Sequence, residues 1–275
     1  MKVAVVIPIY KTTLNKFEII SLTQCKRILG EFPTIFAASE SICLDQIKRI
    51  VTPSKVIIFK KEFFKDIISY STLLLSTLFY KAFVEYDFIL IYQLDAFVFK
   101  NELEYWCKQD YDYIGAPWFE HHAISHKDGN LWRVGNGGFS LRNVKKSIAV
   151  LEKKGIVLSP SAIINEYKQY YGSVGVKLLP RIMLKSIGIH NTTKSYINMF
   201  CIYNEDRFWS YYANKIKPSF KLAPVNAGIK FAFECDPSYL YRSNNNKLPF
   251  GCHAWRKYDF AFWKPFIEQQ GFALE

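Results

Sequence analysis

The 275-residue sequence has no apolar segment long enough to cross a bilayer and no cysteine pair at metal-binding spacing. Its longest uncharged stretch, residues 67–80, is well short of the roughly 20 residues that a membrane-spanning helix requires. The six cysteines are scattered without a CxxC motif, and no signal peptide precedes the first apolar run. We therefore expect a cytoplasmic protein with reduced thiols.

The sequence also lacks internal repeats, low-complexity segments and a recognisable linker. Hydrophobic residues make up 50% of the chain and aromatic residues 17%, which is ample for a well-filled core. These features predict one compact domain.

Acidic residues are outnumbered, because 36 Lys and Arg stand against 24 Asp and Glu and give a formal charge of +12. A basic balance favours anionic partners such as nucleotide diphosphates, nucleic acid or an acidic membrane surface. The basic residues are dispersed and no nucleic-acid recognition module is visible, so we do not expect nucleic acid to be the partner. A basic nucleic-acid-binding protein remains the non-enzymatic alternative.

In the first hundred residues, buried-strand patterns alternate with segments of helical periodicity. Strands are expected over 2–10, 34–38, 55–59 and from Phe88, and helices over 17–29 and 67–83. Pro8 is expected to break the first strand. Further on, strands are expected over 111–116 and 138–141, and helices over 144–153 and 160–171. This order predicts an α/β fold with a mostly parallel central sheet flanked by helices.

Asp95 is the first carboxylate after the apolar run that begins at Phe88. In open α/β sheets, ligands lie just beyond the carboxyl ends of the strands, so Asp95 is well placed to contact one. The alternative is that Asp95 only caps a turn through its own backbone.

Several further motifs occur in a fixed order along the chain. After the opening VVIPIY they are Tyr70-Ser71, YQLDAFVF (92–99), YDYIGAPW (111–118), VGNGGFSLRN (134–143), NEDRFW (204–209) and PFGCHAW (249–255). Together they resemble the GT-A class of nucleotide-sugar glycosyltransferases, and more narrowly an uncharacterised family of glycosyltransferase-like proteins of bacteria and fungi. The resemblance covers roughly residues 1–260.

The resemblance implies a single GT-A (Rossmann-like) domain over residues 1–275, with a nucleotide-binding half (1–100) and an acceptor-binding half (101–275). It implies a nucleotide-sugar donor, expected to be UDP-linked, and a divalent cation, Mn²⁺ or Mg²⁺. The acceptor would be a glycan or a lipid-diphosphate-linked glycan in the synthesis of a bacterial surface polysaccharide such as capsule or O-antigen. Peripheral contact with the anionic inner face of the membrane is compatible with the basic charge.

In the resembling fold, a D-x-D turn and a late histidine hold the cation. Gln93 here replaces the first Asp of that turn, which leaves Asp95 and His253 as the candidate ligands and does not imply strict metal dependence. For a lone histidine such as His253, the alternative is a structural role. The positions that the resemblance places near the donor are Pro8, Tyr10, Ser71, Gln93, Asp95, Gly137 and Gly138.

The acidic pair Glu205-Asp206 carries the catalytic prediction. In inverting GT-A enzymes an acidic pair in this place supplies the general base, which implies Asp206 as the base and Glu205 as an acceptor-binding residue. The alternative is that both acids stabilise a helix N-terminus. Similarly, Gly137-Gly138 could be a plain bend instead of a place where the donor sugar approaches the backbone.

Other enzymatic interpretations keep the α/β fold. His253 followed by Trp263-Lys264-Pro265 is similar to the tail of retaining GT-A enzymes, and a sugar-phosphate nucleotidyltransferase is also α/β, although its glycine-rich loop is missing after Val5. The histidines at 121, 122 and 126 predict a mobile acceptor-side loop, because no further zinc ligand follows at a suitable spacing. Trp118 and Trp132 have two alternative roles, which are stacking on a sugar ring and ordinary packing in the core or at its rim.

Overall fold

A computed structural model describes residues 1–274, and its main element is a sheet in the order β3-β2-β1-β4-β9-β6. The strands of this sheet are β1 Val3–Ile9, β2 Thr34–Ser39, β3 Lys55–Phe59, β4 Phe88–Tyr92, β6 Tyr113–Ile114 and β9 Phe139–Asn143. Strands β1 to β4 pair in parallel, and β9 runs antiparallel to its neighbours β4 and β6. The predicted α/β class, with a mostly parallel central sheet flanked by helices, is confirmed.

Strand β1 lies at the centre of the sheet and every one of its residues is buried, as its unbroken apolar sequence predicts. The expectation that Pro8 would break this strand is wrong. Pro8 pairs with Ala37 of β2, at a level where β4 no longer accompanies β1, since β4 pairs only with residues 3–6. A proline is tolerated in a strand where a neighbouring partner is missing.

The helices of the first half pack around these strands. They are α1 Lys16–Leu29, α2 Asp45–Ile50, the 3-10 turn η1 Lys61–Phe64, α3 Ile67–Leu74 and α4 Thr77–Lys81. Helix α1 starts at a capping box in which Asn15 and Glu18 satisfy each other's backbone N–H groups. The helix expected over 67–83 is interrupted after Leu75, because the Ser76 hydroxyl accepts from the N–H of Phe79 and starts a new helix.

Two small sheets extend the main one. They consist of β7 Pro117–Phe119 with β8 Leu131–Val134, and of β10 Ala232–Phe233, β11 Gly251–Cys252 and β5 Phe97–Val98. The antiparallel pairing of β11 with β5 is important for the site, because β5 begins two residues after Asp95 and β11 ends directly before His253. Two segments that are far apart in the sequence are therefore joined at the carboxyl edge of β4.

The second half of the chain is mostly helical. It contains α5 Leu103–Cys107, η2 Glu120–His122, α6 Val144–Leu151, α7 Pro160–Tyr171, η3 Val176–Leu178, α8 Leu179–Ser186, α9 Thr193–Tyr203, α10 Glu205–Tyr211, α11 Ala213–Ile216, α12 Val225–Phe231, α13 Pro237–Ser243 and α14 Phe260–Glu268. The predicted helices over 144–153 and 160–171 correspond to α6 and α7. In the described part of the chain, no helix is long and apolar enough to cross a membrane.

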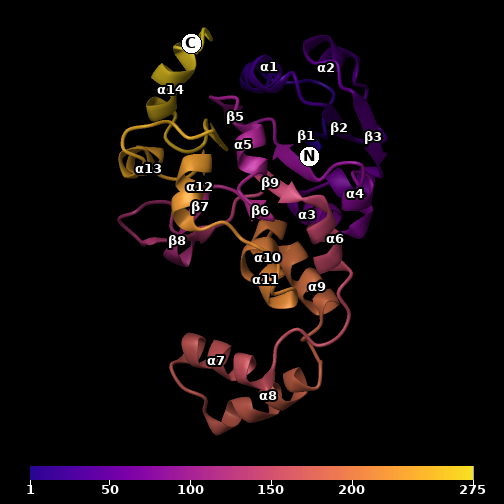
Figure 1. Cartoon of the computed structure of the whole chain (residues 1–275), viewed down its shortest axis with the longest axis vertical. Helices are drawn as coiled ribbons and strands as arrows, with labels where there is room; N and C mark the ends of the chain where they lie inside the picture. The colour runs from indigo at the N-terminus through magenta and orange to yellow at the C-terminus, as the bar shows by residue number, and fades with distance from the viewer. Residues whose placement is uncertain (275) are drawn as a thin grey trace.

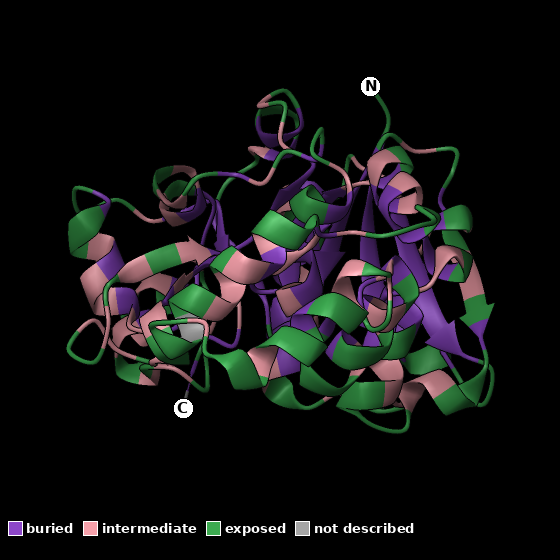
Figure 2. Ribbon diagram, turned by 90° about the horizontal axis from the view of Figure 1, so that it is seen from below, coloured by how far each residue is buried: buried purple, intermediate pink, exposed green. Residues whose placement is uncertain are grey.

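Residues 155–191, which include α7, η3 and α8, form what we call the helical lobe. Figure 1 shows α7 and α8 set apart below the body of the molecule. The two ends of the lobe are joined by an antiparallel β-bridge between Ile156 and Thr192. They are also joined by the Asn191 side chain, which donates to the Leu158 carbonyl and accepts from the Leu158 N–H. Most of the core lies around the buried strands between the helices of the body (Figure 2), and Leu158, Ile163 and Ile182 of the lobe extend it.

Candidate functional site

His253 lies between two carboxylates at the carboxyl edge of β4. Its Nε2 is 3.1 Å from Asp95 Oδ1 and 3.1 Å from Gln93 Oε1, and its Nδ1 is 3.0 Å from Glu234 Oε1. Burial alone would lower the pKa of His253, but the charges of Asp95 and Glu234 outweigh it and raise this pKa to about 10. The imidazole and the two acids therefore form one electrostatic unit.

Asp95 is the outermost member of this unit, because about half of its side chain is exposed while that of His253 is 12% exposed. Partial burial would raise the pKa of Asp95, but the facing imidazolium lowers it below its usual range. An ionised, half-exposed carboxylate at a strand end can bind a ligand from solvent.

The loop before β9 packs directly against His253. Asn136 Nδ2 is 2.9 Å from His253 Nδ1, and the Gly138 carbonyl accepts from the backbone N–H of Gln93 at 2.8 Å. A Cβ at Gly138 would stand 2.1 Å from His253 Nε2, and one at Gly137 would stand 2.2 Å from Glu205 Oε1. Both glycines are therefore required by neighbouring side chains, and not only by a bend.

Asp206 approaches the same loop from α10. Its Oδ2 accepts from the N–H of Gly137 at 3.2 Å, while its Oδ1 is buried without a hydrogen-bond partner in the described structure. Burial, followed by the charges of Glu205 and Glu234, raises the pKa of Asp206 to about 7. A carboxylate in this state can take up and release a proton near neutral pH.

Glu205, its neighbour, is held by a buried arginine. Arg142 Nη2 donates to Glu205 Oε1 at 2.7 Å and Nη1 donates to Oε2 at 3.0 Å, and the arginine side chain is fully buried. Arg142 also donates to the Tyr80 hydroxyl and to the Gly137 carbonyl. Arg142 therefore ties the start of α10 to the glycine loop through a bidentate pair with Glu205.

The other residues predicted near the donor are more dispersed. Pro8 is buried in β1 and Ser71 is buried in α3, and within residues 1–274 neither is hydrogen-bonded to the His253 group. Tyr10 is 51% exposed. The pKa of its phenol is raised, first by partial burial, then by the charge of Glu18 and then by the charge of Asp95, so Tyr10 lies near Asp95. The structure thus brings Tyr10 to the rim of the site.

The three histidines of the 121–126 segment do not form a common centre. His122 Nε2 is 3.3 Å from the Tyr211 hydroxyl, whereas His126 is paired with Asp236 and stacks on the Tyr239 ring. Across residues 1–274, no group of three or more His, Cys, Asp or Glu side chains is arranged to hold a metal ion.

A divalent cation would nevertheless find suitable partners beside Asp95. Mg²⁺ is commonly held by one or two protein carboxylates together with substrate phosphates, so a complete protein cage is not needed. Asp95 Oδ1, Gln93 Oε1 and His253 Nε2 converge, and a cation would bind this nitrogen only by displacing its proton. Glu234 accepts from the other ring nitrogen, as the outer partner of a ligating histidine does. These residues fit a cation that the donor phosphates would also bind.

One hollow is lined by Asp95, and a second, larger hollow is lined by other residues. The smaller hollow has a volume of about 300 Å³ and is lined by Asp95, Ala254, Arg256 and Lys257. Two positively charged side chains therefore lie near the Asp95 carboxylate. The larger, which we call the cleft, has a volume of about 920 Å³ and lies between the body and the helical lobe. Tyr211, at the end of the helix that carries Asp206, lines the cleft.

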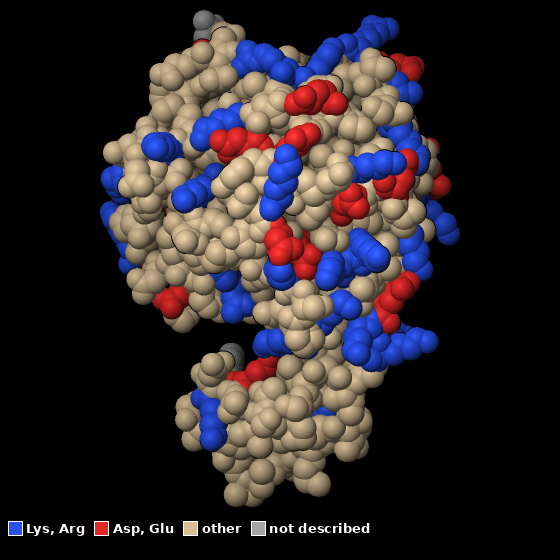
Figure 3. Space-filling model, viewed as in Figure 1, with Lys and Arg blue, Asp and Glu red and all other residues tan. Residues whose placement is uncertain are grey.

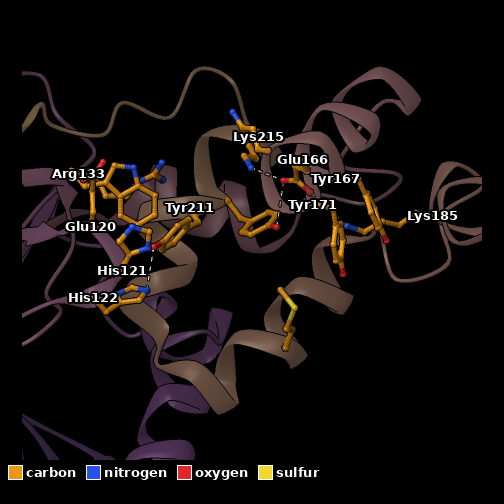
Figure 4. Close-up of a pocket in the computed structure, with 14 residues that line it drawn as sticks. Glu120, His121, His122, Arg133, Glu166, Tyr167, Tyr171, Lys185, Tyr211 and Lys215 are labelled. Atoms are coloured by element: carbon orange, nitrogen blue, oxygen red, sulfur yellow. Dashed lines mark hydrogen bonds and ion pairs between the residues drawn. The ribbon is translucent and has the colours of Figure 1, made fainter. Parts of the chain in front are cut away.

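The cleft is rich in aromatic and charged side chains. In Figure 4, Arg133 and Tyr211 come from the body, whereas Glu166 and Tyr167 come from the helical lobe. The Arg133 guanidinium lies 4.5 Å from the centre of the Tyr211 ring and 4.4 Å from that of Trp132. Lys215 Nζ bridges to Glu166 at 2.6 Å and joins the two walls. Such walls can stack on sugar rings and hydrogen-bond hydroxyl groups.

Sequence reasoning missed several members of the site. Glu234 follows the apolar pair of β10 as Asp95 follows β4, which is a signal of the same kind but on a much shorter strand. Arg142 could have been suspected, since an arginine inside a strand that is otherwise buried requires a carboxylate partner. Nothing local in the sequence distinguishes Asn136 from an ordinary turn residue.

Several solved structures of glycosyltransferases are similar to this chain at low identity. They are the galactosyltransferase LgtC in complex with donor and acceptor sugar analogs (13% identity, 99% of this chain and 97% of that chain, TM-score 0.48), the glycosyltransferase GlyE of Streptococcus pneumoniae TIGR4 (14%, 97% and 60%, TM-score 0.45) and mouse xyloside xylosyltransferase 1 (11%, 91% and 97%, TM-score 0.44).

No curated protein matches the sequence. A family model does, and its match extends over residues 53–253, from β3 to His253. It therefore includes Asp95, the glycine loop, Asp206 and Glu234, which form the site described above. Because this match covers well over half of the chain, the protein belongs to the family described as Protein of unknown function (DUF5672).

Proposed function

We propose that the protein is a glycosyltransferase that moves a sugar from a nucleotide-diphosphate donor, expected to be UDP-linked, to a glycan hydroxyl. The observation that carries this proposal is the convergence of Asp95, the 136–138 loop, Asp206 and His253 at the carboxyl edge of the sheet, next to the hollow that Asp95 lines. Ligands of open α/β sheets bind at this edge.

The diphosphate end of the donor fits the smaller hollow. Arg256 and Lys257 supply positive charge there, and Asp95 with His253 and Gln93 can hold a cation shared with the phosphates. That cation, Mn²⁺ or Mg²⁺, would neutralise the charge that develops on the leaving diphosphate. The residues themselves orient the diphosphate so that the sugar points toward the 136–138 loop.

Asp206 is the general base of the proposed reaction. The acceptor hydroxyl oxygen forms a bond to the anomeric carbon, the bond from that carbon to the diphosphate oxygen breaks, and the hydroxyl proton passes to Asp206 Oδ1. This oxygen has no other partner in the described structure and belongs to a carboxyl group with a pKa of about 7. Because Oδ1 is buried, the carboxyl group must turn toward the acceptor when the acceptor binds. A single displacement of this kind inverts the anomeric configuration.

Glu205 has a different role from the one that the resemblance implies. Its two oxygens are occupied by Arg142, so we assign it the positioning of Asp206 and of the glycine loop instead of acceptor binding. The acceptor is assigned to the cleft, where Trp132 and Tyr211 offer ring faces close to α10.

The remaining parts of the proposal concern organisation and biological context. Residues 1–100 supply the nucleotide-binding half and residues 101–275 the acceptor-binding half of one domain. The acceptor is a glycan or a lipid-diphosphate-linked glycan of a surface polysaccharide, which the enzyme meets at the inner face of the membrane. The excess of basic residues supports contact with diphosphates and anionic lipids.

A donor screen tests this function directly. The purified protein is incubated with a panel of nucleotide sugars, with Mn²⁺ or with a chelator, and release of the nucleotide diphosphate is measured. We expect hydrolysis of one donor class, and its loss in His253→Ala. NMR of the transferred sugar decides between inversion and retention. Absence of turnover with every donor, together with absence of UDP binding, would refute the proposal.

A further inference from the structure

The helical lobe exposes a row of large apolar side chains on its outer surface. Val176, Met183 and Ile187 are 81%, 70% and 71% exposed, well beyond what partly buried packing residues show. The members of the row are Val176, Leu179, Met183, Leu184, Ile187 and Ile189. Steps of three and four residues place most of them on one side of η3 and α8, so that they form a continuous stripe.

Folding of the lobe does not account for this stripe. Helix α8 packs inward through Ile182, which is 6% exposed, and through Lys185, which contacts Glu166 and the rings of Tyr167 and Tyr196. None of the six stripe residues lines the cleft. A contiguous apolar surface of this kind indicates a binding partner.

The charge around the stripe is of one sign. Between Glu166 and Glu205 the sequence contains no Asp or Glu, whereas five Lys or Arg residues occur there. Lys177 and Arg181 lie within η3 and α8, are exposed, and make no ion pair with any residue of the range 1–274. Figure 3 shows the lobe as mostly uncharged beneath a more heavily charged body.

We propose that the stripe on residues 176–189 docks on the surface of an anionic lipid bilayer. The apolar side chains would enter the boundary between headgroups and acyl chains, and Lys177 and Arg181 would contact acidic headgroups, as in interfacial amphipathic helices. A second copy of the chain fits less well, because a symmetric pair would bring the same basic residues face to face. The inference specifies the membrane contact of the proposed function, and its test is independent of glycosyl transfer.

Vesicle flotation of the full-length protein tests the inference. Phosphatidylcholine vesicles that contain phosphatidylglycerol are compared with vesicles of phosphatidylcholine alone, at low and high salt. We expect wild-type protein to float with the anionic vesicles, and less so in high salt. The combined substitution Val176→Ser, Met183→Ser and Ile187→Ser should weaken the partition coefficient at least about a hundredfold, because three inserted apolar side chains are removed.

A matched control uses three apolar side chains of similar exposure on the body. Ile67, Leu78 and Val84 are 70%, 55% and 66% exposed, and changing all three to Ser should leave flotation within about twofold of wild type, since these side chains lie outside the lobe. A second lobe variant, Lys177→Gln with Arg181→Gln, should weaken binding about fivefold per charge. This variant keeps every apolar contact and serves as the test if the triple substitution in the lobe disturbs folding.

Three outcomes would overturn the inference. These are wild-type protein that does not float with anionic vesicles, equal losses in the lobe and body variants, and a dimer in light scattering that the lobe substitutions convert to a monomer. The last outcome would assign the stripe to a second copy. Asp206→Asn should float like wild type, so failure of membrane docking and failure of the proposed transfer are separable.

Discussion

The substitution Asp206→Asn distinguishes a buried general base from an acid that only stabilises the start of α10. The two interpretations predict opposite changes in the melting temperature. An acid in the first turn of a helix normally stabilises that helix, by about 1 kcal/mol at most, so its removal should lower the melting temperature. The raised pKa of about 7 predicts the opposite for Asp206. A carboxyl group that titrates near 7 in the folded state and near 3.9 when unfolded binds its proton more tightly in the folded state.

This difference makes the folded protein less stable as the pH rises from about 4 to about 7, and the loss is complete above pH 7. Three pKa units correspond to an upper bound of about 4 kcal/mol. At pH 8 we expect Asp206→Asn to be more stable than wild type by at least about 1 kcal/mol, or about 2–4 °C in Tm. Near pH 4 the difference should be small, because the wild-type carboxyl group is then protonated in the folded state and about half protonated in the unfolded state.

The same variant should be a poor catalyst. Transfer to the acceptor should fall at least about a hundredfold, the lower end of the range for a general base, while binding of UDP is unchanged. Wild-type kcat/KM should decline about tenfold per pH unit below pH 7, and the residual activity of the variant should lack this dependence. The measurements are calorimetric melting and coupled transfer assays between pH 4 and 9.

Asp45→Asn is the matched control, because Asp45 is an exposed acid in the first turn of α2. It should lower the melting temperature slightly at pH 8 and leave transfer unchanged. If Asp206→Asn is destabilised in the same way, or transfers sugar at the wild-type rate, Asp206 is not a buried general base.

The remaining predictions concern the metal, the buried ion pair and the cleft. Isothermal calorimetry should show that wild-type protein binds UDP more tightly with Mn²⁺ than with chelator and that Asp95→Ala removes this difference; equal affinities in wild type would contradict the cation role. Glu205→Gln should lower the free energy of unfolding in urea by about 3–5 kcal/mol, because Arg142 stays buried without its counter-charge, whereas Glu104→Gln in the exposed pair with Lys108 should cost less than about 1 kcal/mol. Trp132→Ala should raise the acceptor KM about tenfold in steady-state kinetics and leave donor hydrolysis unchanged; an unchanged KM would place the acceptor elsewhere.

Local sequence patterns were sufficient for the main strands and several helices. The apolar runs at β1 and β4 predict buried parallel strands. The structure confirms this, because every residue of both strands is buried in the sheet. The same patterns predict Asp95 at a strand end. They could not show that Pro8 is tolerated in β1, because this depends on which strand lies beside it at that level. The second helix after Ser76 has a local cause, a serine N-cap, which the helical periodicity over 67–83 concealed.

The site depended on contacts that no local pattern encodes. His253 was a candidate only through the family resemblance, and the pairing of β11 with β5 brings it between Asp95 and Glu234. Glu205 and Asp206 are adjacent acids in the sequence, yet Arg142 neutralises one and leaves the other buried with a raised pKa. The assignment of different roles to two neighbouring carboxylates is therefore a consequence of tertiary structure.

Hydrophobic periodicity along the chain is enough to predict the α/β class and the strand end at which we propose that ligands bind. The tertiary structure alone decided which polar side chains meet there, since Asp95, Asp206 and His253 come from segments far apart in the sequence. The tertiary structure also determines which apolar residues in 176–189 are exposed. No helix is predicted there from the sequence, and only the packed fold shows that these apolar residues form a stripe that faces outward.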